Sequence, residues 1–236
     1  MNTEEYWDTK VRAAEGDPRR AVGVDDPALN RCIERVQQLL VTRALRRAVS
    51  RMENCHSVFD FGCGAGRWAA HITNNGMQYS GADLSGRMVE LAKLKNPNAH
   101  IKKLNAGGPL PWPNATFDLA MSIAVLHHNP PSEQERYICE LSRILKKGGN
   151  LLIFESVRTG ATSGAVASGL EFPRSHAGWC QLAEMYHLRM REVAGARYQI
   201  LARVVERYFS NRAPRLRRAA LRLDAFLAPR LSRWIP

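Results

Sequence analysis

The segment Asp60-Phe-Gly-Cys-Gly-Ala-Gly66 places one carboxylate and three glycines within seven residues. Glycine lets the backbone turn sharply and lets a ligand approach without meeting a Cβ. We expect a helix to follow, with its positive N-terminal end facing that ligand. The glycine spacing differs from the dinucleotide-binding fingerprint, and no Lys-Ser or Lys-Thr pair follows as it would in a P-loop. The segment therefore indicates a ligand-binding turn of another kind.

A second carboxylate, Asp83, comes about 20 residues after the glycines, at the end of an expected strand. In a doubly wound sheet, a carboxylate at this place accepts hydrogen bonds from the hydroxyl groups of a ribose. Glycine triplets alone are often ordinary tight turns. The order of the elements that follow therefore carries more weight than the glycines themselves.

Strands and helices are expected to alternate from residue 58 to residue 154. A capping box at Ser132-x-x-Glu135 predicts the start of one helix, and the glycines after Lys146 predict its end. The expected strands are 58–61, 77–82, 100–104, 118–123 and 151–154, and the expected helices are 67–75, 86–94 and 132–145. This alternation predicts an α/β fold with a doubly wound, mainly parallel sheet and a ligand at the carboxyl ends of the strands.

Four motifs occur in order within about residues 55–155, namely DFGCGAG, GADLS, LPWPNATFDLAMSIAVLHH and RILKKGGNLLIFE. In this order and spacing they resemble the class I S-adenosylmethionine-dependent methyltransferases, of the small single-domain kind that act on metabolites. The resemblance implies a Rossmann-like methyltransferase fold, S-adenosyl-L-methionine as the cofactor, no metal ion, and a small-molecule acceptor.

The resemblance also implies roles for particular positions. Asp60 and the glycines would hold the methionine part of the cofactor, Asp83 its ribose, and Leu84 would pack on the adenine. Asn105 stands where the family usually has an aspartate, and its side-chain carbonyl can still accept from the adenine amino group. The implied cofactor-binding residues are Asp60, Gly62, Cys63, Gly64, Gly66, Asp83, Leu84, Asn105, Ala106 and Ser122.

Methyl transfer from such a cofactor needs few special residues, because the sulfonium methyl group is already activated and the protein mainly aligns the reactants. For a hydroxyl acceptor a general base helps, and histidine is the usual choice. By position, His128 and His127 are the candidate catalytic residues, with His176 as a further one. Each can equally be a packed core histidine, and Glu155 is more typical of a cap or an ion-pair partner. We expect methylation at oxygen.

The composition is typical of a cytoplasmic enzyme. The 236 residues leave room for one domain with a full core. The apolar runs fall far short of the roughly 20 residues needed to span a bilayer. Glu4, Glu5 and Asp8 stand where a signal peptide would be basic and then apolar. The five cysteines are scattered without a CxxC pair, which predicts neither a disulfide framework nor a zinc site.

Three parts are expected along the chain: an N-terminal helical lid (1–50), a methyltransferase core (51–200) with a mobile flap at about 156–175, and a basic helical tail (201–236). Tyr6 and Trp7 would line the lid or anchor its helix to the core. The lid helix should start at Asp26-Pro27. Its expected apolar face is Leu29, Ile33, Val36, Leu40 and Ala44. The family's closing antiparallel hairpin is expected in part from residues 188–193 and 197–200.

The tail carries most of the positive charge. Residues 189–236 hold 12 arginines and 3 acids, which is +9 of the chain's net +12. An apolar stripe runs between the arginines, formed by Leu216, Ala220, Leu223, Leu227, Leu231 and Trp234, with an expected bend at Pro229. Three interpretations compete. The tail packs on its own domain, which the sequence slightly favours, or it lies on an anionic membrane surface, or it follows the phosphates of RNA.

The sequence thus favours a cytoplasmic S-adenosylmethionine-dependent methyltransferase with a small-molecule acceptor. The alternatives are an enzyme for a quinone or lipid-linked substrate, peripheral at the inner membrane surface, and an RNA methyltransferase. Nucleic acid is the less favoured partner, because no recognition domain is added. A non-catalytic cofactor-binding protein, or an enzyme that uses the same cofactor for another transfer, would show the same motifs. The identity of the acceptor is not encoded in any of them.

Overall fold

A computed structural model describes residues 3–14, 27–157, 171–193 and 214–231. The chain forms two compact units, each built from two separate stretches of sequence. The first unit consists of Met1–Ala21 and Ala48–Arg189, and the second consists of Val22–Arg47 and Met190–Pro236. The sheet and all the residues with expected chemistry belong to the first unit.

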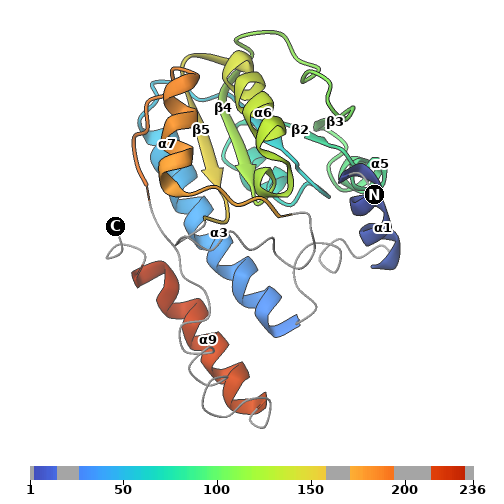
Figure 1. The fold of residues 1–236 in the computed structure, drawn as a ribbon, viewed down its shortest axis with the longest axis vertical. Coiled ribbons are helices and arrows are strands. Elements are labelled where there is room, and N and C mark those ends of the chain that lie inside the picture. Colours follow the sequence, from blue (N-terminus) through green and yellow to red (C-terminus); the bar gives the residue numbers. More distant parts are fainter. Residues whose placement is uncertain (1–2, 15–26, 158–170, 194–213, 232–236) are drawn as a thin grey trace. The chain divides into compact units, whose positions relative to one another are not determined.

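The first unit contains a five-stranded sheet in which every paired neighbour is parallel (Figure 1). Its strands are β1 (Ser57–Phe61), β2 (Gln78–Asp83), β3 (His100–Lys103), β4 (Phe117–Ile123) and β5 (Leu145–Phe154). They lie in the order β3-β2-β1-β4-β5. The order reverses between β1 and β4, and ligands of doubly wound sheets bind at the carboxyl ends of the strands at this switch point. The predicted fold class is confirmed.

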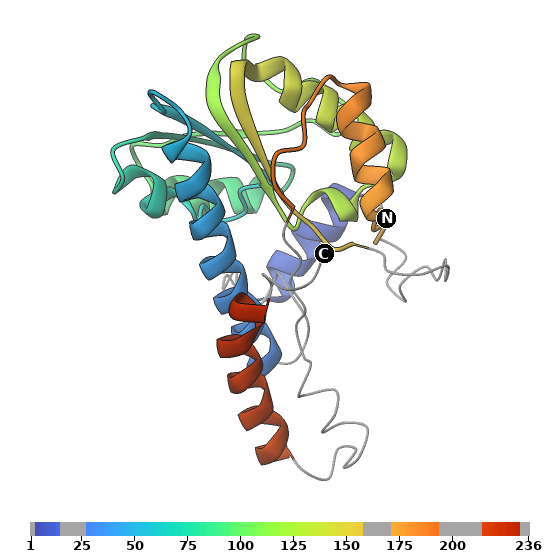
Figure 2. The same cartoon turned by 90° about the vertical axis from the view of Figure 1, so that its left-hand side faces the viewer.

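The helices of the first unit include three that connect strands, one that precedes β1 and one that follows β5. They are α1 (Thr3–Ala13), α4 (Ala69–Thr73), α5 (Gly86–Lys95), a 3-10 turn η1 (Leu126–His128), α6 (Pro131–Ile144) and α7 (His176–Met185). In both views α6 and α7 lie side by side on the same face of the sheet (Figures 1 and 2). α5 packs against β2 and β3, and α1 packs against α5.

The core of the first unit is built on the two central strands. All seven residues of β4 are buried, as are the last four of β1. Continuous burial of this kind is typical of parallel strands that are covered on both faces. Phe61 packs against Tyr137 of α6, and Phe59 against Phe117. The strands that carry the expected site are therefore anchored in the best-packed part of the unit.

The start of α6 differs from the expectation. Pro130 is the N-cap residue, and the structure has no side-chain cap there, so the predicted capping box at Ser132 is wrong. Pro131 occupies the first turn, where its missing N–H needs no partner and its fixed φ suits the helix. α6 ends at Ile144, within one residue of the predicted end, but β5 begins directly at Leu145 instead of at residue 151.

The predicted closing hairpin is not present in the part of the chain that the structure describes. Residues 188–193 form no strand, and 197–200 lie outside the described residues. All five described strands belong to the parallel sheet. Much of the flap expected at 156–175 also lies outside the described residues, and only its two ends can be placed.

The second unit contains most of α3 (Pro27–Ser50) together with α9 (Pro214–Leu231). α3 starts at Pro27 as predicted, but its buried face differs from the predicted one. The buried apolar residues of α3 are Leu29, Cys32, Val36, Val41 and Leu45. Ile33, Leu40 and Ala44 are only half-buried. α9 continues through Pro229 to Leu231. None of the described helices is long and apolar enough to cross a membrane.

Candidate active site at the carboxyl ends of the strands

The glycine turn after β1 contains two glycines whose neighbours leave no room for a side chain and one that faces open space. Gly62, Gly64 and Gly66 all have the left-handed φ that favours glycine. A Cβ on Gly62 would lie 2.4 Å from Val125 Cγ2, and one on Gly66 would lie 2.5 Å from Asn96 Nδ2. A Cβ on Gly64 would meet only Met88 Sδ, at 4.0 Å. Gly64 is therefore where a ligand can approach the backbone closely.

Asp83 is locked onto this turn by backbone donors. Its Oδ2 accepts from the Gly64 N–H at 2.8 Å, and its Oδ1 accepts from the Ser85 N–H at 2.9 Å. Burial raises the pKa of Asp83, although these backbone hydrogen bonds lower it in part. Each carboxylate oxygen keeps a second lone pair, so Asp83 can still accept from a pair of ligand hydroxyl groups.

Asp60 lies beneath the turn, and its side chain is bound by a residue that the sequence did not point to. The Tyr79 hydroxyl donates to Asp60 Oδ2 at 2.8 Å. Burial raises the pKa of Asp60 to about 7, against the lowering effects of the Tyr79 hydrogen bond and the Arg67 charge. Cys63, inside the turn, is buried beside this pair.

The residues expected around an adenine follow β2 and β3. Leu84 is half-buried and packs against the main hydrophobic cluster. The Leu104 N–H donates to the Asp83 carbonyl at 2.8 Å, which joins the end of β3 to the end of β2. Asn105 and Ala106 come next and are exposed. The structure thus brings these residues to the same edge of the sheet as Asp83.

After β4, several groups of the chain donate hydrogen bonds to one carboxylate, that of Glu155. Glu155, directly after β5, accepts from the Val125 N–H at 3.0 Å, from the Leu126 N–H at 2.9 Å and from the Ser122 hydroxyl at 3.2 Å. It also binds the His127 ring, with 2.5 Å between Oε2 and Nδ1. The side chain of Glu155 is 1% exposed and that of His127 is 8% exposed. Glu155 thus caps η1 and binds the ring of His127.

His128 lies between His127 and the first helix. Its ring centroid is 4.0 Å from that of His127 and 5.0 Å from that of Trp7, which meets it edge-on. Tyr6 contacts Trp7 in turn, at 5.2 Å. His176, the further candidate, is exposed at the start of α7, 3.9 Å from the Cys180 sulfur. The four rings from Tyr6 to His127 therefore form a continuous aromatic row.

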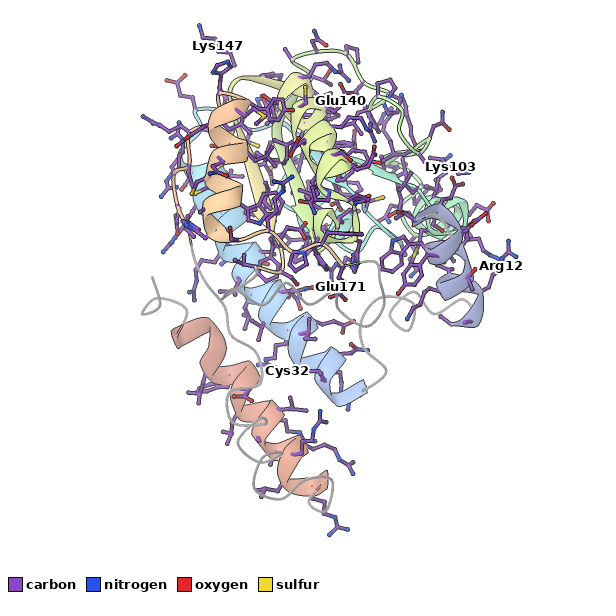
Figure 3. All side chains as sticks on the ribbon, in the orientation of Figure 1. Arg12, Cys32, Lys103, Glu140, Lys147 and Glu171 are labelled. Carbon is purple, nitrogen blue, oxygen red and sulfur yellow. The ribbon has the colours of Figure 1, made fainter. Side chains whose placement is uncertain are left out.

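α1 is held against the site by polar contacts. The Lys103 ammonium at the end of β3 lies 2.6 Å from Glu4 Oε1, and Figure 3 shows Lys103 beside α1. The Ser85 hydroxyl donates to Asp8 Oδ1 at 2.5 Å. Val11 and Ala14 pack on Met88 of α5. α1 is therefore attached beside the residues that hold Asp83.

The far end of the expected flap is attached next to the histidines. The Phe172 N–H donates to the His127 carbonyl at 2.6 Å. Gln134 of α6 donates from Nε2 to the carbonyls of both Asn129 and Phe172, each at 2.8 Å. These bonds hold the backbone at Phe172 against the turn that carries His127.

Sequence reasoning missed Tyr79, and strand register explains how it could have been found. In the β1–β2 pairing Asp60 stands opposite Gly81, and Tyr79 lies two residues earlier on the same face. A Cβ on Gly81 would lie 3.1 Å from the Tyr79 hydroxyl oxygen. The sequence did contain a signal for this contact. Gly81, a small residue, is expected opposite Asp60, and Tyr79 stands two positions before it on the same strand.

Comparisons with known proteins point to the same family as the sequence motifs. Residues 59–153 match a family model described as a methyltransferase domain. The chain is 29% identical over 114 residues to a demethylmenaquinone methyltransferase of Tropheryma whipplei, covering 47% of each protein. It is 37% identical over 98 residues to the tRNA (carboxymethyluridine(34)-5-O)-methyltransferase of Saccharomyces cerevisiae, covering 40% of this chain and 33% of that protein. The chain spans about half or less of the length of these relatives.

Solved structures share the fold. A putative methyltransferase (BH2331) from Bacillus halodurans has a TM-score of 0.59 at 16% identity, covering 77% of this chain and 81% of that one. The [4+2]-cyclase SpnF has a TM-score of 0.56 at 19% identity, covering 82% of this chain and 76% of that one. At this identity the likeness establishes the fold alone.

Proposed function

Since residues 59–153 of this chain are a class I S-adenosylmethionine-dependent methyltransferase domain, we propose that it transfers the methyl group of S-adenosyl-L-methionine to a hydroxyl group of a small-molecule acceptor. The residues present fit such a cofactor. Gly64 leaves open space for its backbone to be approached, and Asp83 keeps lone pairs for a ribose diol. Asp60 supplies a carboxylate for an ammonium group, and Leu84, Asn105 and Ala106 lie where the adenine would be.

The observation that carries the proposal is the pair formed by His127 and Glu155. Val125 packs against the glycine turn so closely that a Cβ on Gly62 would overlap it. The 3-10 turn that follows Val125 holds both histidines. A histidine with a carboxylate partner thus lies next to the turn that would hold the cofactor. This is where a base for an acceptor hydroxyl is needed.

The hydrogen bonds of Glu155 fix the tautomer of His127. Backbone N–H groups donate to both of its oxygens, so the carboxylate acts as an acceptor throughout. Nδ1 of His127 must then be the donor in the 2.5 Å contact, which leaves the lone pair on Nε2. His127 can therefore accept a proton at Nε2 while Glu155 stabilises the positive ring. The same division of roles operates in histidine–carboxylate dyads generally.

When bound, S-adenosyl-L-methionine supplies an activated methyl group that an aligned nucleophile displaces in line. The chain's own part is to orient the acceptor oxygen, to take its proton at His127 Nε2 and to exclude water. Trp7 and the chain around Phe172 lie beside the histidines and serve this exclusion. His128, which the sequence favoured as base, is the alternative, because it lies between His127 and Trp7.

A planar quinol is a second candidate acceptor. The aromatic row from Tyr6 to His127 suits a flat ring, because aromatic rings pack well edge-on or offset. One relative is named as a demethylmenaquinone methyltransferase. Quinones and their quinols are flat rings that carry oxygen substituents. This favours phenols and quinols as the first acceptors to try.

The direct test is methyl transfer from radiolabelled S-adenosyl-L-methionine to catechol, 1,4-naphthohydroquinone, aliphatic alcohols and tRNA. We expect S-adenosyl-L-methionine to bind at micromolar level and label to appear on an oxygen of a phenol or quinol. Label on tRNA alone, or on ring carbon, would replace the proposed acceptor. Binding without transfer to any acceptor would favour a different use of the cofactor, and the fold shared with a cyclase keeps this outcome open.

A further inference from the structure

The buried pair of Asp60 and Tyr79 has a geometry that ordinary core packing does not require. Asp60 is 1% exposed and Tyr79 is 3% exposed, and the hydroxyl donates to Asp60 Oδ2 at 2.8 Å. Gly81 lies opposite Asp60 in the β1–β2 register. A Cβ on Gly81 would lie 3.0 Å from Cys63 and 3.1 Å from the Tyr79 hydroxyl. The hydroxyl is therefore enclosed and holds one carboxylate oxygen in place.

The charges around Asp60 come from each element packed against it. Tyr79 and Cys63 have pKa values raised by burial, so both are neutral and act on Asp60 through hydrogen bonding and packing. Arg67, after the glycine turn, favours the ionised carboxylate, and Asp83 opposes it. Burial outweighs these effects and raises the pKa of Asp60 to about 7. Near neutral pH, Asp60 is thus divided between its charged and uncharged forms.

We propose that Tyr79 is a positioning residue for the cofactor, holding Asp60 Oδ2 so that Oδ1 receives the ammonium group of the methionine part, and that Asp60 releases a proton when this cation binds. The inference rests on the proposed cofactor site and does not depend on the identity of the acceptor. It assigns Tyr79 a role in cofactor affinity and makes that affinity sensitive to pH in the physiological range.

The sign of the pH effect follows from linkage. The carboxylate must be ionised to pair with an ammonium group, and without the ligand it is protonated below about pH 7. Binding at lower pH must first remove this proton, so affinity falls by about tenfold for each pH unit below the pKa. Above the pKa the carboxylate is already charged, and the affinity levels off.

The experiment is calorimetric titration of the full chain with S-adenosylhomocysteine, which keeps the ammonium group, from about pH 5.5 to 8.5. Titrations in two buffers of different ionisation enthalpy count the protons released. We expect affinity to rise with pH up to about 7 and a fractional proton to be released there. 5′-Methylthioadenosine, which lacks the ammonium group, should bind without this release.

Variants separate positioning from packing. Tyr79→Phe removes the hydrogen bond that favours the ionised form, so the rise in affinity should move to higher pH, with about tenfold weaker binding at neutral pH. Asp60→Asn should abolish the rise. Tyr137→Phe is the matched control, because Tyr137, on α6, is about as buried as Tyr79 but packs against Phe61. Asp83→Asn reports how much of the profile belongs to the second carboxylate, whose pKa is also raised.

The outcomes distinguish this inference from the proposed function. If S-adenosylhomocysteine fails to bind at any pH, the cofactor site itself is refuted. If it binds with a flat pH profile, or if 5′-methylthioadenosine releases the same protons, only the role of Asp60 and Tyr79 is refuted. Should Tyr79→Phe fail to fold, the comparison of the two ligands on the unaltered chain still decides between these results.

Discussion

At the scale of single residues, the site depends on three buried acids that differ in how they are held. Asp83 is bound by backbone N–H groups, Asp60 by a tyrosine, and Glu155 by backbone groups together with a histidine. A backbone N–H donor is kept by every substitution except proline, whereas a hydroxyl or a ring is removed by many. The chemistry of each acid therefore responds differently to mutation.

Removing the ring of His127 tests the proposed base. His127→Ala should lower turnover with a phenolic acceptor by about 10²–10⁴-fold, because proton transfer by a positioned side chain contributes that much. Affinity for S-adenosylhomocysteine should stay close to that of the unaltered chain. Steady-state kinetics paired with calorimetry makes both measurements. If instead His128→Ala causes the larger loss, the base is His128.

Glu155→Gln tests the dyad without changing side-chain size. Glutamine retains one oxygen but offers an NH₂ group to the ring, so His127 should adopt the other tautomer and turnover should fall. Nitrogen NMR of labelled His127 reports the tautomer independently of activity. Glu140→Gln is the matched control, since Glu140 on α6 (Figure 3) is also a carboxylate bound by a backbone N–H and a basic side chain. An unchanged tautomer in Glu155→Gln would contradict the assignment.

Asp83→Ala tests the ribose contact. Loss of hydrogen bonds to a charged partner should weaken S-adenosyl-L-methionine binding by about 1–3 kcal/mol. Calorimetry measures this, and thermal unfolding of the unliganded variant separates it from damage to the glycine turn. Unchanged affinity would remove Asp83 from the cofactor site.

The residues that could be predicted are those with a local pattern. Asp60, the glycines and Asp83 follow from spacing along one strand–turn–helix unit, and the structure brings them together. Tyr79 could not be assigned in this way, because its contact with Asp60 depends on the register of two strands. Glu155 was interpreted as a cap or an ion-pair partner. It caps η1, and its contact with His127 joins residues that lie far apart in sequence.

At the scale of elements, Asp118 ties the starts of three strands together. It accepts from the backbone N–H groups of His56 and Ser57, from the Ser57 hydroxyl, and from Lys146 at the start of β5. β4 is thereby joined to both neighbouring strands at the edge opposite the site. These bonds hold the three strands in register at the end of the sheet that lies opposite the site.

The pKa of Asp118 makes this contact sensitive to acid. Burial alone would raise that pKa, but the hydrogen bonds from Lys146 and Ser57 and from the backbone lower it to about 2. A folded-state pKa below the unfolded value near 3.9 gives stability that is present above about pH 4 and is lost as the pH falls towards 2. Asp118→Asn should therefore lower the melting temperature at pH 7 and make little difference near pH 2, as calorimetry can measure. An equal effect at both pH values would exclude the charge as the cause.

The order of helices and strands could be predicted because apolar runs and helical periods alternate along the sequence. All five predicted strands are present in the sheet. Boundaries were less readable. The start of α6 is set by Pro131 and not by Ser132, and β5 extends six residues earlier because its pairing with β4 resumes after an irregularity between Phe117 and Leu119. The buried face of α3 was misplaced because burial depends on what packs there, and a helical period does not contain that information.

At the scale of the whole molecule, α9 combines a packed face with an exposed one. Ala220, Leu221 and Asp224 are buried, and the charge of Asp224 raises the pKa of Cys32 on α3, after burial itself, to about 11. Leu223 is 53% exposed and Leu216 is 45% exposed. These observations support the interpretation that the tail packs on its own unit. Within the described residues, Leu216 and Leu223 remain exposed, as the membrane interpretation requires.

Substitution of two leucines on α9, one buried and one exposed, distinguishes the packed side of the helix from the side that would dock on a membrane. Leu221→Ala should destabilise the chain by about 2–5 kcal/mol, because a fully buried leucine is truncated, whereas Leu223→Ala should change the melting temperature little. Sedimentation with vesicles containing phosphatidylserine tests the exposed side. If that side docks, Leu223→Ala together with Leu216→Ala should weaken sedimentation without affecting cofactor binding. Steeply salt-dependent RNA binding with no vesicle binding would instead favour the RNA interpretation.

The division of the chain into interleaved units also orders events on the ribosome. All but the N-terminal stretch of the first unit lies between residues 48 and 189, so its sheet can assemble as soon as that stretch has been synthesised. The second unit needs Val22–Arg47 together with Met190–Pro236, which is made more than 140 residues later. The apolar side of α3 must therefore wait, incompletely covered, during the synthesis of everything between. During this delay α3 exposes apolar surface of the kind that chaperones bind.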